Sequence, residues 1–309
     1  MAVRSQPSSK KAAFEGVAQN VDGKYVEPEQ IALHDPDLYT FDAVAEPLSG
    51  LASIGSEEIQ HFYDHGYIAV ENAFSSQEVC DGLDGLEYLA LGKHPEFKNI
   101  IFESAAKDRL EGLCEEERLD SIRKMMYFVD CEPRLNAIAN HTQLLAVLRR
   151  LIGSAELTMF QDMALIKPPS IGREKPWHQD CAYFDVPPQS PIVGVWIALD
   201  EAGLDNGCMR VLDGGHREGP QIHFERRDWQ ICDSDVETLH TSDHPVVAVP
   251  LQPGGCMLFS GLLPHGTPCN TSDKRRRALQ FHYRPEDTET IPTEERLAAF
   301  GSEGKNVSC

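Results

Sequence analysis

The residues best suited to chemistry lie in one short stretch, PWHQD at positions 176–180. Residues two apart on a β-strand share a face, so an extended segment here directs His178 and Asp180 to one point and Gln179 away from it. Two ligands of this kind cannot hold a metal alone. The best candidate for a third is His265, in the segment LLPHGT at 262–267. Two histidines and one carboxylate on one face of an Fe(II) ion leave its other positions open, as in non-haem iron oxygenases.

A His-x-Asp tripeptide is weak evidence on its own, because it arises by chance in a chain of 309 residues. Three consecutive arginines, 275–277, lie at the start of the last predicted strand, immediately before Ala278. Alternation along that strand sends Arg276 to one side and its two neighbours to the other. A buried guanidinium offers two parallel donors to a carboxylate, such as the 5-carboxylate of 2-oxoglutarate. The cluster also fits a solvated basic edge, and spacing alone does not choose between these interpretations.

The elements that must position these residues are mainly short strands separated by Gly, Pro and Asn turns, which is typical of a sandwich or jelly roll. Helices are predicted to begin near Ser56, at Ser75 or Ser76, and at Thr142, each with an apolar stripe or a capping residue. The predicted strands are Tyr67–Val70, Met125–Val129, Leu157–Ile166, Trp177–Tyr183, Ile192–Leu199, Cys208–Leu212, Val246–Pro250, Cys256–Ser260 and Ala278–Arg284.

Three segments flank or interrupt this predicted body. Residues 1–50 are interpreted as an N-terminal tail and irregular lead-in, and 286–309 as a C-terminal tail with a short helix. The domain between them is predicted to span residues 51–285. Residues 215–245 form a long polar insertion, which is often a lid or a binding loop in a β domain.

Composition limits the classes of partner. The chain has 28 basic and 49 acidic residues, a formal net charge of −21, which argues against nucleic acid or an anionic membrane surface as the main partner. No apolar run reaches the roughly 18 residues of a membrane span, and the N-terminus lacks the apolar core of a signal peptide. Nine cysteines without a CxxC spacing favour a reducing compartment. We therefore expect a cytoplasmic enzyme with a small-molecule substrate; the sequence leaves its oligomeric state open.

Several motifs, in order, resemble the phytanoyl-CoA dioxygenase family. They are ALIKPP at 164–169, PWHQD at 176–180, VWIALD at 195–200, NGCMRVL at 206–212, Gly215-His216 and HGT at 265–267. The resemblance covers roughly residues 57–285. It implies a mainly β fold with flanking helices, a double-stranded β-helix (a cupin-like jelly roll), that holds Fe(II) and 2-oxoglutarate.

The resemblance also implies roles for individual residues. His178, Asp180 and His265 match the iron ligands, which are the catalytic centre of the family, and Arg276 matches the arginine that binds the distal carboxylate of 2-oxoglutarate. Thr267 stands where the family has a hydroxyl residue for the same carboxylate. Trp196 and Met163 match positions that line the cosubstrate pocket, although either fits an ordinary core residue. The family's further polar residue falls at Lys124 or Met125, and the alignment leaves that choice open.

The implied activity is that of a dioxygenase. It uses O2, with ascorbate as a possible reductant, to hydroxylate or otherwise oxidise an unactivated C–H bond, and it releases succinate and CO2. Asp180 favours hydroxylation, desaturation or ring closure over halogenation, because related halogenases have a small residue at this position. The substrate stays open among acyl-CoA, amino-acid-like solutes and natural products, and we favour a small metabolite. The alternatives are a divalent-metal hydrolase or isomerase, or a non-catalytic binding domain, on the same fold.

Overall fold

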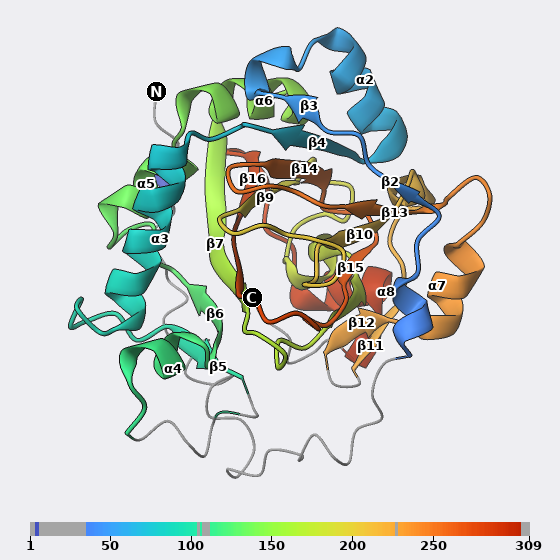
Figure 1. Cartoon of the computed structure of the whole chain (residues 1–309). Helices are drawn as coiled ribbons and strands as arrows, with labels where there is room; N and C mark the ends of the chain where they lie inside the picture. The colour runs from blue at the N-terminus through green and yellow to red at the C-terminus, as the bar shows by residue number, and fades with distance from the viewer. Residues whose placement is uncertain (1–3, 6–34, 104–105, 107–111, 226–227, 304–309) are drawn as a thin grey trace.

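A computed structural model describes residues 4–5, 35–103, 106, 112–225 and 228–303 (Figure 1). Two β-sheets stack at its centre, and helices cover the outer side of the larger one, as the mainly β prediction required. The larger sheet has the order β3 (Leu48–Ser49), β4 (Tyr67–Glu71), β14 (Cys256–Ser260), β9 (Val193–Ala198), β16 (Arg276–Pro285), β7 (Leu157–Lys167), β6 (Ile122–Met126) and β5 (Ile100–Phe102), with β1 (Arg4–Ser5) beside β7.

The smaller sheet carries the residues of the predicted metal site. Its order is β2 (Ala43–Val44), β13 (Val246–Val249), β10 (Met209–Leu212), β15 (His265–Thr267) and β8 (Lys175–His178). The two sheets enclose an apolar core that includes Trp196, Val211 and Met257. The prediction of a double-stranded β-helix is confirmed.

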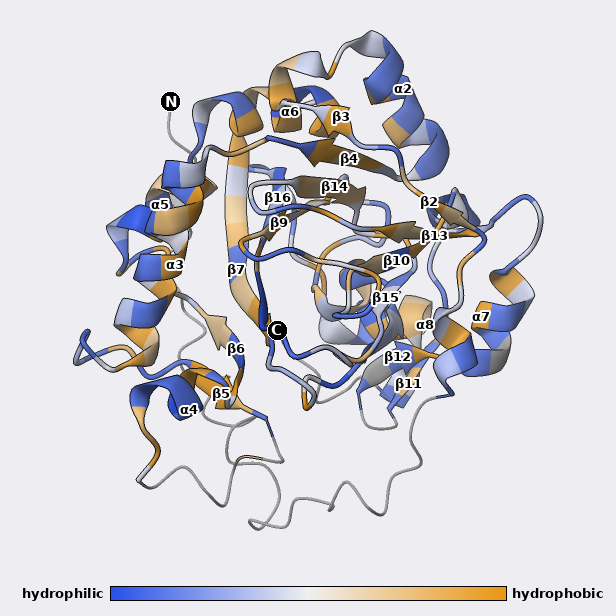
Figure 2. Cartoon of the chain, viewed as in Figure 1, coloured by the Kyte–Doolittle hydropathy of each residue, from blue (hydrophilic) through white to orange (hydrophobic). Residues whose placement is uncertain are grey.

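Helices pack against the outer face of the larger sheet, where strand and helix side chains form a second apolar core. Figure 2 shows hydrophobic residues on the central strands and hydrophilic residues on the outer turns of the helices. The helices are α2 (Ser56–His65), α3 (Ser76–Ala90), α4 (Glu115–Leu119), α5 (Pro133–Ala139), α6 (Thr142–Ile152), α7 (Asp233–Leu239) and α8 (Thr293–Phe300). Among the described residues, no helix combines the length and the apolar character that crossing a bilayer requires.

Strand β16 has one face in the helix-facing core and the other in the space between the two sheets. Its odd-numbered residues Leu279, Phe281 and Tyr283 belong to the helix-facing core. Its even-numbered residues, beginning with Arg276, therefore face the space between the sheets. Arg276, Gln280 and His282 are all buried there, with at most 3% of their surface exposed.

Two predicted strands differ from the observed ones. The strand predicted for Trp177–Tyr183 ends at His178, and Asp180–Tyr183 form a 3-10 turn, η5. The strand predicted at Met125–Val129 lies earlier, because Tyr127 adopts a φ of 58° that ends the extended backbone. The carboxylate of Asp162 on β7 then accepts hydrogen bonds from the N–H groups of Tyr127, Phe128 and Val129.

The N-terminal lead-in is fastened to the smaller sheet from residue 38 onward. The indole N–H of Trp177 donates to the carbonyl of Leu38, and Arg210 donates to that of Tyr39. Strand β2 pairs in parallel with β13, where the side chain of Asp42 accepts from the N–H of Val246. Trp177 and Arg210 thus lie on the outer side of this sheet, away from the space between the sheets.

The 215–245 insertion has structure of its own. It contains the 3-10 turn η6 (Gly215–Glu218), the hairpin of β11 (His223–Glu225) and β12 (Trp229–Ile231), and helix α7. Asp228, between the two strands, forms ion pairs with Arg173 (3.0 Å) and Arg123 (3.4 Å) and lies 3.8 Å from the amine of Lys175. The insertion is therefore tied to strands of both sheets.

Candidate active site

The pairing of β15 with β8 brings the two predicted histidine ligands together. His265 lies directly opposite His178, and their ring centroids are 4.3 Å apart. Asp180 follows on the first residue of η5, with its Oδ1 atom 3.3 Å from Nε2 of His178 and 3.7 Å from Nε2 of His265. The ligand atoms of these three buried residues lie within 4.8 Å of one another. The convergence predicted from strand alternation is present, although a turn and not a strand produces it.

The tautomers of both histidines suit a metal. Nδ1 of each ring lies 2.8 Å from a backbone carbonyl, that of Pro176 for His178 and that of Leu263 for His265. A carbonyl can only accept, so Nδ1 carries the proton in each ring. The unprotonated Nε2 atoms are then directed at Asp180 Oδ1, and such a carbonyl contact is the usual partner of a metal-binding histidine.

Charge states also match a divalent cation. Burial lowers the pKa of His265 to about 3 and lowers that of His178. Burial alone would raise the pKa of Asp180, but the field of His265 and His282 and the hydrogen bond from His282 outweigh it, and this pKa lies well below its usual value. At neutral pH the site holds two neutral imidazoles and one carboxylate.

The two oxygens of Asp180 have different partners. Oδ2 accepts a hydrogen bond from Nε2 of His282 at 2.7 Å and another from the side-chain amide of Gln280 at 3.2 Å. Neither residue lies in the motifs that identified the candidate ligands. Both share the inner face of β16 with Arg276, so the alternation used for the arginines could have identified them.

Gln179, between two candidate ligands, faces away from them as predicted. Its side chain bonds to the carbonyls of Gly219 and Leu262, and its backbone N–H donates to Nε2 of His223 in β11 at 3.0 Å. His223 was placed only within a predicted lid. The structure shows that it connects the insertion to the segment that carries His178 and Asp180.

Arg276 is the first residue of β16, and its side chain is buried. The Cζ atom of its guanidinium lies over the ring of Trp196, 5.3 Å from the ring centroid. Nη1 donates to the carbonyl of Leu165, while Nε has no hydrogen-bond partner. Burial lowers the pKa of Arg276 to about 10, so the group is still a cation at neutral pH. Its neighbours in sequence differ: Arg277 pairs with Asp200, and Arg275 with Asp120. Among the described residues, no carboxylate forms an ion pair with Arg276.

The remaining predicted cosubstrate residues lie along the same inner surface. Met163 on β7 and Trp196 on β9 are the cross-strand neighbours of Gln280, and both are buried. Trp196 has an indole Nε1 without a hydrogen-bond partner. Thr267 lies two residues beyond His265 and is buried on β15. Buried donors that lack partners are uncommon and indicate a bound molecule or water.

The structure separates the two alternatives left open on β6. Met125 belongs to the helix-facing core and is fully buried there. Lys124 precedes it and therefore faces the other side, where its cross-strand neighbour Leu165 packs against the core between the sheets.

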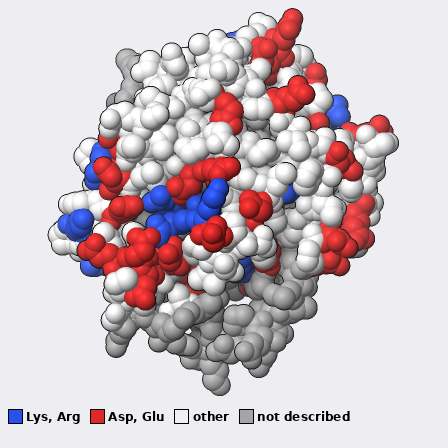
Figure 3. Space-filling model, viewed as in Figure 1, with Lys and Arg blue, Asp and Glu red and all other residues white. Residues whose placement is uncertain are grey.

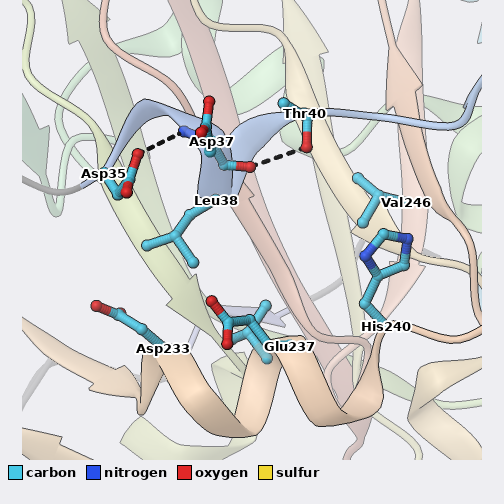
Figure 4. A pocket seen from close by; sticks show the side chains of 9 residues that line it. Asp35, Asp37, Leu38, Thr40, Asp233, Glu237, His240 and Val246 are labelled. Atoms are coloured by element: carbon cyan, nitrogen blue, oxygen red, sulfur yellow. Dashed lines mark hydrogen bonds between the residues drawn. The ribbon is translucent and has the colours of Figure 1, made fainter.

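A separate cavity of about 250 Å³ lies between the 3-10 turn η2 (Pro36–Tyr39) and helix α7 (Figure 4). Its polar side chains include Asp35, Asp37, Glu237 and His240. Asp35 accepts from the N–H of Asp37 and so caps the turn. None of the lining residues belongs to the cluster around Asp180, so the chemistry of the donors, and not the size of this cavity, defines the candidate site.

Figure 3 shows Asp and Glu spread over one face of the molecule, beside the Lys and Arg on it.

Gly194 is needed for the packing behind the histidines. A Cβ atom at this position would lie within 2.6 Å of Cε1 of Phe259. The Phe259 ring packs against His265, with centroids 4.9 Å apart, and against His282 at 6.3 Å. We expect Gly194→Ala to destabilise the protein by about 1–3 kcal/mol through overpacking and to weaken metal binding. Urea unfolding and a Co(II) titration measure both. Adding Phe259→Leu, which removes the obstructing ring, should restore much of each loss; unchanged metal affinity in Gly194→Ala contradicts the account.

The metal-free protein should lose stability in mild acid. Burial lowers the pKa values of His265 and His223 to about 3, while an unfolded histidine titrates near 6.5. Between these values the unfolded chain binds more protons, so stability rises with pH, by up to about 1.4 kcal/mol per unit for each imidazole. We expect the urea midpoint, with a chelator present, to fall from pH 7 to pH 5. Equal midpoints at both pH values would contradict buried neutral imidazoles.

Comparisons with known proteins identify a family and relatives of similar sequence. The model of the family described as phytanoyl-CoA dioxygenase (PhyH) matches residues 62–278. A phytanoyl-CoA dioxygenase domain-containing protein 1 homolog from Caenorhabditis briggsae is 27% identical over 268 residues, which cover 72% of this chain and 88% of the relative. A probable phytanoyl-CoA dioxygenase from Caenorhabditis elegans is 28% identical over 253 residues, 76% of this chain and 77% of the relative.

Solved structures share the fold. EctD from S. alaskensis, crystallised with 2-oxoglutarate and 5-hydroxyectoine, superposes with a TM-score of 0.65 at 22% identity and covers 88% of this chain and 86% of its own. SnoK, a non-heme alpha ketoglutarate dependent carbocyclase from nogalamycin biosynthesis, gives a TM-score of 0.62 at 21% identity, with 85% of this chain and 98% of its own covered.

Proposed function

Since the chain belongs to the phytanoyl-CoA dioxygenase family and is a 2-oxoglutarate-dependent oxygenase of that kind, we propose that it uses Fe(II) and O2 to oxidise an unactivated C–H bond of a small organic metabolite. Hydroxylation is the first expectation, with release of succinate and CO2. One observation carries the proposal. The Nε2 atoms of His178 and His265 converge with a carboxylate oxygen of Asp180. The same molecule holds Arg276, a buried cation that has no anionic partner among the described residues.

His178, Asp180 and His265 hold the metal in this proposal. The carbonyls of Pro176 and Leu263 fix both imidazoles in the tautomer whose Nε2 lone pair is available. Asp180 supplies the negative charge that balances part of the cation's charge. The bound iron supplies the oxidative chemistry, and the protein supplies orientation, charge and exclusion of water.

Arg276 receives the distal carboxylate of 2-oxoglutarate. Its Nε lacks a partner, and a carboxylate would satisfy it and return the guanidinium to a paired state. Thr267 adds a hydroxyl donor, and Trp196 and Met163 form the walls. Trp196 also supports the guanidinium, because a cation over an aromatic face is stabilised when both are dry.

The substrate is proposed to enter beside Tyr183. The ring of Tyr183 packs edge-on against His178, with centroids 5.9 Å apart, and its hydroxyl accepts a hydrogen bond from Lys175 at 2.9 Å. Trp177 and Arg210 face the outer side of the smaller sheet, where they bond to Leu38 and Tyr39. Because Tyr183 packs against a candidate ligand and bonds to Lys175, this pair is proposed to contact a small polar metabolite.

A hydrolase, an isomerase or a binding domain could use the same three ligands, but none needs a buried cation for a dicarboxylate. The discriminating experiment incubates the purified protein with Fe(II), 2-oxoglutarate and ascorbate, with and without pooled metabolites, and measures succinate. We expect succinate that depends on iron and rises with one of the pools. No succinate in any pool, together with no 2-oxoglutarate binding by calorimetry, would argue against the dioxygenase.

A further inference from the structure

The two oxygens of Asp180 are held in an unequal way that the three candidate ligands alone do not explain. Oδ1 faces the Nε2 atoms of His178 and His265. Oδ2 faces the opposite way, toward β16, and accepts from His282 and Gln280. Oδ1 is thus placed to bind a cation, whereas Oδ2 already accepts hydrogen bonds from two donors.

His282 has an environment that leaves it one strong polar contact. Its side chain is fully buried, and the rings of Phe184, Phe160 and Phe259 surround it at centroid distances of 5.1, 6.1 and 6.3 Å. Its Nδ1 atom has no hydrogen-bond partner. The hydrogen bond from Nε2 to Asp180 therefore sets the ring's orientation, and the apolar surroundings strengthen that bond.

Gln280 lies one inward position before His282 on the same strand. Its cross-strand neighbours are Trp196 and Met163, the two proposed wall residues of the cosubstrate pocket. The amide of Gln280 thus links the pocket for the dicarboxylate to the oxygen of Asp180 that faces away from the metal. Both donors reach the same atom, so a rotation of the carboxylate breaks two hydrogen bonds at once.

We propose that His282 and Gln280 are positioning residues that make Asp180 bind the metal through Oδ1 alone. The inference rests on the proposed function, because it concerns the metal of that site. If Asp180 bound through both oxygens, the three side chains would occupy four of the roughly six positions of the metal. A chelating 2-oxoglutarate would fill the other two, and none would be left for O2. With Oδ2 engaged by β16, three positions stay open.

Three variants test this. His282→Phe fits the aromatic surroundings but removes the donor, His282→Gln retains a donor, and Gln280→Leu removes the second one. We expect His282→Phe to lower affinity for Co(II) and Fe(II) by about 10- to 100-fold, as the loss of a hydrogen bond behind a metal ligand does. The absorption band of the Fe(II)–2-oxoglutarate complex should weaken or shift. His282→Gln should recover part of both effects, and Gln280→Leu should cause smaller changes of the same sign.

Phe184→Leu is the matched control, since it alters the same apolar surroundings without touching a hydrogen bond to Asp180, and it should retain the wild-type spectrum. The inference is overturned if folded His282→Phe protein has wild-type metal affinity and an unchanged band. If His282→Phe does not fold, Gln280→Leu and His282→Gln provide the test. Wild-type metal affinity and an unchanged absorption band in both variants would reject the inference. Failure of wild-type protein to bind metal or 2-oxoglutarate rejects the proposed function itself, which is a different result.

Discussion

Replacing Arg276 by alanine is expected to weaken 2-oxoglutarate binding by about 2–5 kcal/mol, or roughly 30- to 4,000-fold in Kd, while metal binding is retained. The buried guanidinium has no carboxylate partner among the described residues, so the distal carboxylate of the cosubstrate would lose the buried cation proposed to bind it. Calorimetry with 2-oxoglutarate in the presence of Co(II), and a separate Co(II) titration, measure the two affinities.

The arginine beside it gives a matched control. Arg275 forms ion pairs with Glu116 and Asp120, away from the space between the sheets. Arg275→Ala removes the same number of atoms and the same charge, but we expect it to leave 2-oxoglutarate affinity within a few-fold of wild type. Equal losses in both variants would mean that the general positive charge, and not the position of Arg276, attracts the diacid. Loss of metal and 2-oxoglutarate together in Arg276→Ala would make its role structural.

Replacing Asp180 by alanine is expected to abolish iron-dependent succinate formation and to lower metal affinity by more than about 100-fold. Changes behind a metal ligand already cost about 10- to 100-fold, and this variant removes a ligand atom. It also leaves the donors of His282 and Gln280 buried without their acceptor, at a cost of about 1–3 kcal/mol each. Metal titration by calorimetry and succinate assays measure the outcome.

Asp185 supplies the control for that experiment, because it lies in the same loop region and pairs with Arg296 at 2.8 Å. We expect Asp185→Ala to cost stability but to bind metal as wild type does. Wild-type metal affinity in Asp180→Ala would place the metal elsewhere and would remove the central observation behind the proposed function.

The sequence predicted the fold class and the residues that converge, but the reason it offered for the convergence was partly wrong. Family motifs identified His178, Asp180 and His265, and the structure brings them together. Strand alternation was the physical argument, yet β8 ends at His178 and Asp180 begins a turn. Alternation did hold on β16, a long strand paired on both sides, where it separates Arg276 from its neighbours.

The contacts that sequence reasoning could not supply join segments far apart in the chain. The hydrogen bond between His282 and Asp180 depends on how the two sheets face each other, and that between His223 and Gln179 depends on the path of the insertion. A histidine on a predicted inner face is compatible with simple packing until its neighbour is known. Local pattern gives the face of a strand, and only the tertiary arrangement gives the partner.

The attachment of residues 38–44 to the smaller sheet sets a lower limit on how far the protein can be shortened. A version that starts near residue 50, where the composition suggests that the folded body begins, would lack β2 and so uncover the backbone edge of β13. It would also remove the carbonyl of Leu38 that accepts from the indole of Trp177 and the ring of Tyr39 that stacks on it. Trp177 immediately precedes a candidate iron ligand. An open strand edge invites pairing between molecules. Versions made for crystallisation should therefore keep the chain from residue 35 onward.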